Sequence, residues 1–509
     1  MINQAWSKRL VIVALPIIVA VFYFTAVIHF SYTPDDTYIY LRFAKNLIGG
    51  NGISFNPGVP TYGFTSPLWL FIISLGGAMG IDLYVAAKAL DLVFASFALI
   101  VFYFLSYGLI RDVAVAICAT VAFSVNAWLM RWAGTGMETS LSVLLMLAVF
   151  LFCFRNEYFV AVVLTALLSL VRPEAALIVP IILLDVYLNS LNKKRALNLA
   201  AALLLIYVAM IVPWLAYAHY TFGTMLPNTA LAKAGFHPGV KELLATGVDI
   251  VKTIGVTEGI AVLTLIVSGI VLFTKREKLK GEGNPDRDQT FFLFRQGIIG
   301  IGWIFLLPFF YLVTDVNIVS RYLLLVTPIM TILAFSLLYY SMKLSAVKRF
   351  VNGGILLLTM LVMMQNQIVY RLIVAPGIAA FEQGMDNCLI PIGKWLNQNT
   401  SPGTKVVTGD VGAIGYFSER EICDAAGLLT PDAHQVLRQG NTGDEIIEKK
   451  LYKTFCQPDY VIHRAPEPDQ LKNDPELLPL LSRPFLGLSL SDQRITYYTL
   501  YQVKKISDE

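Results

Sequence analysis

The chain of 509 residues is 56% hydrophobic and only 15% charged, with a formal net charge of +4. Soluble domains are roughly a quarter charged, so this composition excludes an ordinary soluble protein and indicates an integral membrane protein. The small, scattered net charge gives no reason to expect a nucleic-acid partner, and the five cysteines lie far apart without a metal-ligand spacing.

Apolar runs long enough, or nearly long enough, to cross a bilayer recur along the first three quarters of the chain. They lie at residues 10–29, 67–79, 86–110, 113–128, 141–154, 158–171, 175–188, 196–217, 259–273, 297–313, 322–340 and 355–370. The first run follows Lys8 and Arg9 without a small-residue cleavage site, so we expect a retained signal anchor. The sequence predicts an all-α multispan bundle of about 11–13 transmembrane helices, with membrane lipids around it.

Lysine and arginine in short loops mark the cytoplasmic side of a membrane protein. They cluster at residues 8–9, 193–195, 275–280 and 343–349. Alternation then places residues 134–138, 172–174, 227–233, 315–321 and everything after 370 outside the cytoplasm. The twelve runs would return the chain to the cytoplasm. One run between residues 67 and 128 must therefore be short or re-entrant. The apolar pattern also predicts that no charges lie deep inside the spans.

The amino-acid composition changes after residue 375, where charged residues, prolines and glycines become frequent again. Residues 405–411, 421–425, 459–464 and 494–503 have strand patterns. We therefore predict a transmembrane module at residues 1–375 and a soluble extracytoplasmic α/β domain at residues 376–509. A nucleotide-binding fingerprint would need more than the glycines after Thr408, so we interpret Asp410 and Gly412 as a structural turn that faces the membrane module.

The first extracytoplasmic loop, at about residues 31–66, is far longer than a connector between two spans requires. Thr33 is a suitable N-cap for a helix with Asp36 three residues later, so its acids have a purely structural interpretation. On that helix Asp35 and Arg42 share one face, and Asp36 and Tyr40 lie on an adjacent face. A glycine-rich return and the polar stretch "TYGFTSP" follow.

These stretches carry a family resemblance. "DDTYIYLRFAKNLIGGNGISFNPG" and "YGFTSPLW" resemble the first extracytoplasmic loop of the GT-C glycosyltransferases, in the branch of the mycobacterial terminal arabinofuranosyltransferases. The later stretches "WAGTGMETSL", "RPEAAL", "LPNTALAK", "SRYLL" and "GAIGYFSEREICDAAGL" fit the same branch. Tyr40 stands where this branch often has serine, and Val59-Pro60 stands where it often has an acidic residue; these departures leave the sugar open.

The resemblance implies a multi-pass glycosyltransferase of the bacterial cytoplasmic membrane. Such an enzyme moves a hexosyl or pentosyl group from a polyprenyl-phosphate donor to a glycan, lipid or protein acceptor of the cell envelope. The acceptor hydroxyl loses its proton as it attacks the anomeric carbon, and one of two adjacent carboxylates can serve as the base. The resemblance assigns this role to Asp35, with Asp36 orienting the acceptor.

We expect no required cofactor and no dedicated metal site, although Asp35 and Asp36 could hold Mg²⁺ or Mn²⁺ weakly. The leaving phosphate gains negative charge and needs cations. Three of the candidates for substrate binding also have a structural alternative. Arg321 could extend to the membrane interface, Glu138 could cap a helix, and Asn228 could form a turn. The predicted substrate-binding residues are Arg42, Tyr62, Thr65, Glu138, Arg172, Asn228, Lys233 and Arg321.

Two other classes of function compete with this prediction. A transporter or lipid flippase of envelope precursors would also be polytopic, but the two halves of the sequence show no symmetry. A non-catalytic scaffold of an envelope assembly would not need the acidic pair or the long first loop. Release of polyprenyl phosphate from a lipid-linked sugar would separate the enzyme from both.

Overall fold

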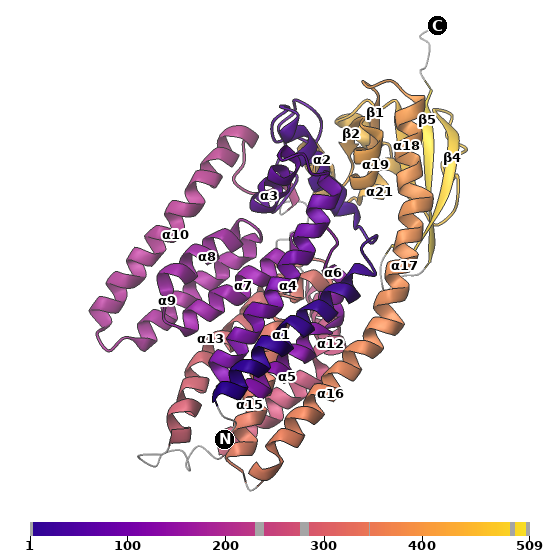
Figure 1. The fold of residues 1–509 in the computed structure, drawn as a ribbon. Helices are drawn as coiled ribbons and strands as arrows, with labels where there is room; N and C mark the ends of the chain where they lie inside the picture. The colour runs from indigo at the N-terminus through magenta and orange to yellow at the C-terminus, as the bar shows by residue number, and fades with distance from the viewer. Residues whose placement is uncertain (1–3, 230–238, 275–284, 346, 489–493, 505–509) are drawn as a thin grey trace.

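The computed structural model describes residues 4–229, 239–274, 285–345, 347–488 and 494–504. A helical bundle fills most of the molecule, and a small sheet lies at one end of it, opposite the N-terminal end of the first helix (Figure 1). The helices up to the middle of the chain are α1 (Gln4–Val27), α2 (Asp35–Ile48), α3 (Pro67–Ala78), α4 (Leu83–Ile110), α5 (Val113–Ser124), α6 (Ala127–Trp132), α7 (Thr139–Phe154), α8 (Tyr158–Ser169), the 3₁₀ turn η1 (Pro173–Leu177), α9 (Ile178–Asn189) and α10 (Lys193–Phe222). The bundle continues with α12 (Val240–Thr274), α13 (Pro285–Val313), α14 (Ser320–Leu323), α15 (Thr327–Lys343) and α16 (Val351–Val369).

Most of these helices coincide with the predicted apolar runs. Within the described residues, five helical segments are long and apolar enough to cross a membrane by themselves, at Arg9–Val27, Leu83–Ile110, Lys193–Phe222, Val240–Thr274 and Lys348–Asn399. The shorter apolar helices include α5, α7 and α8. The predicted all-α membrane bundle is confirmed. The run at residues 113–128 was too long, because Asn126 ends it and caps α6 through the N–H groups of Trp128 and Leu129.

Helix α3 is one of the short helices of the bundle, with 12 residues like α5, α8 and α9. Its 12 residues reach only about 18 Å, short of a roughly 30 Å hydrocarbon core. At its start the Leu68 N–H donates to the Leu170 carbonyl at 3.1 Å. Near its end Gly77 lies against Ile48 and Leu83, at the end of α2 and the start of α4. Helix α3 therefore packs among the end of α8, the end of α2 and the start of α4.

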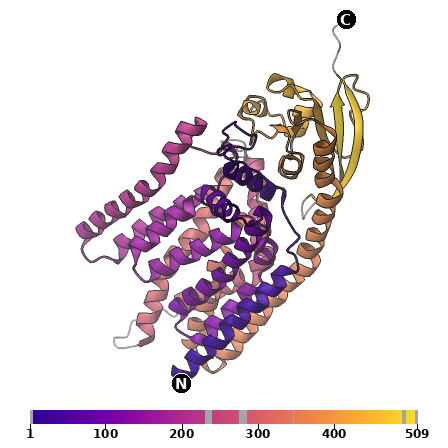
Figure 2. The same cartoon turned by 45° about the horizontal axis from the view of Figure 1, so that its top comes forward.

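A nearly unbroken helix joins the bundle to the sheet. Helix α16 continues through a π-helical segment, η4 (Tyr370–Val374), into α17 (Ala375–Gly384), and a second one, η5 (Met385–Leu389), leads into α18 (Ile390–Asn399). In both views this segment runs from the bundle up to the yellow strands (Figures 1 and 2). The predicted division at residues 375/376 falls inside this continuous helix.

The C-terminal sheet has five strands in the order β2-β1-β3-β5-β4. Strands β2 (Glu421–Asp424), β1 (Lys405–Thr408) and β3 (Tyr460–Ala465) are parallel, whereas β5 (Ile495–Val503) and β4 (Leu477–Leu486) are antiparallel to their neighbours. Four strands were predicted, and β4 was missed. Pro479 and Pro484 argue against a strand in sequence, but β4 lies at an edge, where a missing N–H is tolerated.

Buried charges inside the bundle contradict the expectation that the spans hold none. Lys88 and Asp91 in α4 are completely buried, and Glu258 in α12 and Asp185 in α9 are nearly so. Each has hydrogen-bond partners within the protein. Partners of this kind offset the cost of burying a charge, which the apolar pattern of a run cannot reveal.

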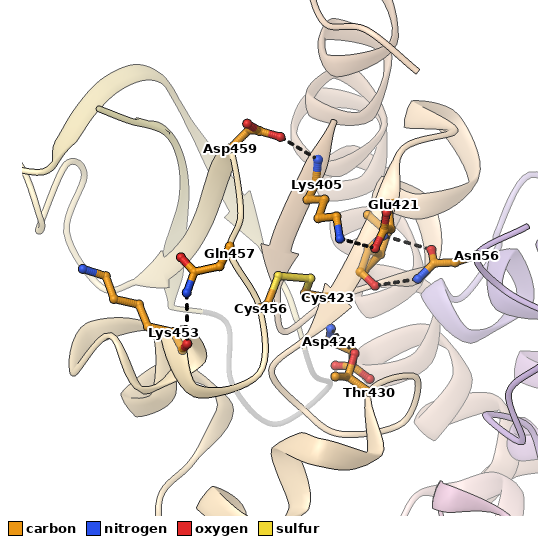
Figure 3. The surroundings of a disulfide bond; sticks show 11 residues. Asn56, Lys405, Glu421, Cys423, Asp424, Thr430, Lys453, Cys456, Gln457 and Asp459 are labelled. Atoms are coloured by element: carbon orange, nitrogen blue, oxygen red, sulfur yellow. Dashed lines mark hydrogen bonds and ion pairs between the residues drawn. A yellow bond between two sulfur atoms is a disulfide. The ribbon is translucent and has the colours of Figure 1, made fainter. Parts of the chain in front are cut away.

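A disulfide joins β2 to the segment before β3, although the cysteine spacing gave no sign of it. Cys423 and Cys456 are 33 residues apart, with Cα atoms at 6.3 Å (Figure 3). On the other side of β2, the Asn56 side chain from the first loop donates to the Ile422 carbonyl and accepts the Ile422 N–H, both at 2.9 Å. The first loop therefore covers the free edge of this sheet.

We predict that replacing both cysteines, Cys423→Ser with Cys456→Ser, lowers the free energy of unfolding by roughly 2–4 kcal/mol, because the unfolded chain regains the freedom of a 33-residue loop. Thermal unfolding of the purified protein in detergent, with and without reductant, measures the effect. The free, half-buried Cys118 supplies the control variant Cys118→Ser. Equal stability of the double variant and the control would contradict the prediction.

Candidate functional site

A cavity of about 420 Å³ lies where the first loop, the end of the bundle and the C-terminal domain meet. This volume is in the range of small-molecule sites. Its wall comes from α2 (Asp36, Ile39, Tyr40), the first loop (Gly63, Phe64, Thr65), the α6–α7 connection (Met137, Glu138), the η1 region (Arg172, Pro173, Glu174, Ala176, Leu177), the segment after α10 (Leu226, Pro227, Thr229), the α13–α14 region (Phe310, Tyr311, Thr314, Val316, Arg321, Tyr322) and the C-terminal domain (Leu428).

Helix α2 begins one residue later than the capping pattern predicted. Asp35 is its first residue, and Pro34 occupies the N-cap position without a side-chain hydrogen bond. The Thr33 hydroxyl does not cap the helix, because it accepts a hydrogen bond from the Lys88 ammonium at 2.9 Å and lies 3.0 Å from the Tyr84 hydroxyl. The predicted cap at Thr33 is therefore wrong, although Asp35 and Asp36 do lie in the first turn of α2.

Asp35 faces the C-terminal domain and does not line the cavity. Its two carboxylate oxygens accept the N–H groups of Gly412 at 2.8 Å and Ala413 at 2.7 Å, at the start of α19 (Gly412–Ser418). A Cβ atom at Gly412 would lie 2.0 Å from the Asp35 carbonyl oxygen, so only glycine fits there. The structure thus places the turn at Asp410 and Gly412 against the membrane module, as expected.

The environment of Asp35 disfavours its charged form. Burial raises the pKa of this carboxyl to about 7, and the nearby negative charge of Asp410 acts in the same direction. The hydrogen bonds from Ala413 and Gly412 oppose the shift. Asp35 therefore lies at the interface between the bundle and the C-terminal domain, and its pKa is about 7.

Arg42 holds the other end of α19 and is not available to a substrate. Its guanidinium donates to the carbonyls of Phe55 and Arg420, both at 2.8 Å, and to the Gly415 carbonyl. An anion at the amino end of a helix and a cation at its carboxyl end both complement the helix dipole. The face of α2 that carries Asp35 and Arg42 therefore docks the C-terminal domain.

The adjacent face of α2 carries Asp36 into the cavity. Its Oδ2 accepts a hydrogen bond from Nη2 of Arg321 at 2.6 Å. The Arg321 side chain is 8% exposed and the Asp36 side chain 37% exposed, so the cation is buried and the carboxylate is partly open. The guanidinium also lies over the rings of Trp132 and Tyr322, at 5.3 and 5.4 Å.

A second arginine also lies near Tyr322. The Arg172 guanidinium is 5.1 Å from the Tyr322 ring centre and pairs with Glu138 at 2.9 Å. Glu174 lies 3.7 Å from Arg172 and accepts the Tyr311 hydroxyl at 2.7 Å. The cavity is therefore lined by two buried cations that contact the same aromatic ring, and by three carboxylates.

Some donors of these arginines are unused. Among the residues that the structure describes, Nε of Arg172 and Nε of Arg321 are buried without a hydrogen-bond partner. A buried donor without a partner costs free energy. Both arginines line the cavity, so an anion there would complement the positive charge of their guanidinium groups.

The structure brings together part of the predicted site. Thr65, Glu138, Arg172 and Arg321 line the cavity with Asp36. Lys233 lies outside the described residues. Among the described residues no group of three or more His, Cys, Asp or Glu side chains is placed to hold a metal ion.

Tyr62 and Asn228 lie behind the wall of the cavity. The Tyr62 hydroxyl accepts Nε1–H of Trp214 at 2.8 Å, and its ring stacks on Phe222 with centroids 5.1 Å apart. The Asn228 side chain donates to the Leu428 carbonyl at 3.1 Å, and its backbone N–H donates to the Tyr62 carbonyl at 2.9 Å. Asn228 therefore connects the first loop to the C-terminal domain, whereas the Tyr62 side chain packs on the end of α10.

Sequence reasoning missed several residues of the cavity wall. Tyr40 and Tyr322 had a usable signal, since Tyr40 shares a helix face with Asp36 and Tyr322 follows Arg321 directly. Glu174 follows Pro173 in η1 and lies close to Arg172. Leu428 ends the stretch "GAIGYFSEREICDAAGL" that carries the resemblance, whereas Tyr311 lies within the apolar run at residues 297–313 and had no signal.

Comparison with solved structures identifies the fold. The chain is similar to the crystal structure of ArnT from Cupriavidus metallidurans bound to undecaprenyl phosphate, with a TM-score of 0.58 and 13% identity over 95% of this chain and 97% of that chain. At this identity the match shows the fold alone, a GT-C-type membrane bundle with a small C-terminal sheet domain. The model of a family described as "Domain of unknown function (DUF8728)" matches residues 377–501. No curated protein matches.

The raised pKa of Asp35 predicts a pH-dependent stability. Because the folded pKa of about 7 lies above the ordinary value of 3.8, the carboxyl contributes stability that is present below about pH 4 and is lost as the pH rises through 7. At about 1.4 kcal/mol per pKa unit, the difference between 3.8 and about 7 corresponds to a loss in unfolding free energy on the order of 4 kcal/mol. Asp35→Asn cannot ionise, so its unfolding temperature should fall less than that of the wild type between pH 5 and pH 8.

Glu419 provides the control for this experiment. It lies at the carboxyl end of α19, and its pKa is lowered, first by its hydrogen bond from Lys45. Its contribution therefore has the opposite sign and appears in the acid range, so Glu419→Gln should leave the slope between pH 5 and pH 8 unchanged. Parallel curves for the wild type and Asp35→Asn would contradict the assignment of the slope to Asp35.

Proposed function

We propose that this protein is a glycosyltransferase that moves a sugar from a polyprenyl-phosphate donor to an acceptor of the cell envelope. The observation that carries the proposal is one cavity that combines a carboxylate, Asp36, with two buried arginines, Arg172 and Arg321. The cavity belongs to a fold that, in ArnT, was crystallised with undecaprenyl phosphate. The resemblance of the first loop to GT-C glycosyltransferases supports the same function.

The reaction assigns a role to each of these groups. An acceptor hydroxyl attacks the anomeric carbon of the donor while Asp36 takes its proton. The bond between the anomeric carbon and the phosphate oxygen breaks, and polyprenyl phosphate leaves as a monoester with one more negative charge. Arg321 and Arg172 stabilise this charge as it develops. We place the base at Asp36, whereas the resemblance favoured Asp35, because both Asp35 oxygens contact backbone N–H groups of α19.

The ion pair between Asp36 and Arg321 suggests an order of binding. Without a ligand, the proposed base and the proposed phosphate-binding cation neutralise each other at 2.6 Å. A donor phosphate competes for Arg321 and so releases Asp36 to accept a proton. Donor binding before acceptor binding follows from this competition, and it would keep the base inactive until a donor is present.

The location of the site supports an extracytoplasmic reaction. The positive-charge pattern puts the cavity and the C-terminal domain outside the cytoplasm. The disulfide between Cys423 and Cys456 agrees, since disulfides persist mainly in oxidising compartments. We therefore propose a multi-pass protein of the bacterial cytoplasmic membrane with its C-terminal domain outside.

The finer proposals rest on the sequence resemblance alone. They are a pentosyl or hexosyl donor in the arabinofuranosyltransferase branch, a glycan, lipid or protein acceptor, and no required cofactor. A transporter or flippase is less consistent with the cavity, which lies at one end of the bundle, whereas transporter sites lie near the bilayer midplane.

Substitution of the two aspartates tests the base. Asp36→Asn should lower turnover at least about a hundredfold, because the amide cannot accept the acceptor proton. Asp35→Asn should retain most of the turnover per folded molecule and lose mainly stability. The measurement is release of polyprenyl phosphate from synthetic polyprenyl-phosphate pentoses and hexoses by protein in detergent. Loss in Asp35→Asn with retention in Asp36→Asn would move the base back to Asp35.

Substitutions of Arg321 test whether this side chain contacts the donor phosphate or only extends to the membrane interface. Arg321→Ala should reduce the single-turnover rate more than donor affinity, because the phosphate charge grows toward the transition state. Arg321→Lys should recover part of the rate, since it keeps the charge without the bidentate guanidinium. Both quantities are measured with the same lipid-linked donor. Wild-type values in Arg321→Ala would remove this residue from the proposed phosphate site.

A further inference from the structure

Two opposite charges lie one helical turn apart, completely buried, on one face of α4. Lys88 and Asp91 have no exposed surface. Neither residue lines the cavity. Charges inside a membrane bundle are costly and usually serve a function, so their contacts indicate what they hold.

Lys88 holds the segment that leads into α2. Its ammonium donates to the Tyr32 carbonyl at 2.7 Å and to the Thr33 hydroxyl at 2.9 Å. The rings of Phe30 and Tyr84 lie 5.2 and 5.1 Å from the ammonium nitrogen. Because α2 starts two residues after Thr33, the position of Lys88 fixes the start of the helix that carries Asp36.

Asp91 holds the turn that leads to Glu138. A single carboxylate oxygen accepts the Thr135 N–H at 2.8 Å, the Thr135 hydroxyl at 3.1 Å and the Gly136 N–H at 3.1 Å. Gly136 has φ of +84°, and a Cβ atom there would lie 2.8 Å from the Thr37 side chain. This turn therefore requires glycine at position 136, and it leads within two residues to Glu138, which pairs with Arg172.

The two held segments also contact each other. The Thr37 hydroxyl donates to the Thr135 carbonyl at 3.1 Å, and Nε1–H of Trp69 donates to the Gly136 carbonyl at 3.1 Å. One face of α4 thus fixes two segments that each lead to a residue of the cavity wall, Asp36 in one case and Glu138 in the other.

We propose that Lys88 and Asp91 are positioning residues that set the separation between the Asp36 wall and the Glu138 wall of the site. This inference rests on the proposed glycosyl transfer, and it adds two residues that touch neither donor nor acceptor. Elsewhere in the bundle, buried charges join helices to one another. Asp185, for example, accepts the Tyr158 hydroxyl at 2.9 Å, near the end of α9 remote from η1.

Turnover of matched variants tests the role. Asp91→Ala should lower kcat roughly tenfold to a hundredfold per folded molecule, since small misplacements of reacting groups have effects of this size, with little change in donor affinity. Asp91→Asn keeps an oxygen for the three donors and should recover most of the rate. Lys88→Met should resemble Asp91→Ala, and Lys88→Arg should be milder. Asp185→Ala, the control, should lose stability and keep kcat.

Hydrogen exchange gives a readout that needs no turnover. Asp91→Ala should speed amide exchange in residues 134–138 and also in the first turn of α2, whereas Asp185→Ala should change neither. Unchanged kcat in Asp91→Ala, or faster exchange confined to residues 134–138, would overturn the positioning role. A wild-type protein that released no polyprenyl phosphate from any donor would count against the proposed function alone, because the exchange result stands without it.

Discussion

The structure depends on the docking of α2 against α19. Asp35 accepts hydrogen bonds from the first two N–H groups of α19, and Arg42 donates to carbonyls at its other end. These contacts join residues more than 370 positions apart, and they fix the C-terminal domain over the end of the bundle. The cavity has a wall from that domain, Leu428, only because this interface holds. The same short helix thus assembles the two parts of the molecule and presents Asp36 to the cavity.

Charge inside the cavity is arranged near one aromatic ring. Arg172 and Arg321 both contact Tyr322, and each guanidinium has a carboxylate partner, Glu138 or Asp36. Two nearby cations without partners would repel each other in a site with little water. The carboxylates reduce that repulsion while no ligand is bound. In the proposed reaction the donor phosphate replaces Asp36 as the partner of Arg321, so that substrate binding also activates the proposed base.

Much of the architecture follows from the sequence by simple physics. Hydrophobic runs predict the helices of the membrane bundle. Strand patterns predict β1, β2, β3 and β5. The failures have definite causes. The edge strand β4 was not predicted because it contains prolines. The disulfide was not predicted because its cysteines are far apart in sequence. Lys88 and Asp91 were not recognised as buried charges because their sequence neighbours are apolar.

The sequence by itself predicts a site at the acidic start of the first-loop helix, since this loop is far longer than a connector needs and carries paired carboxylates. It placed Asp36, Thr65, Glu138, Arg172 and Arg321 among the candidates, and the structure brings these five to one cavity. Only the tertiary structure decided which aspartate faces that cavity. Neighbouring residues on a helix point about 100° apart, so Asp35 and Asp36 must meet different surroundings. What each one meets is set by Gly412 and Arg321, which lie hundreds of residues away and come near only through folding.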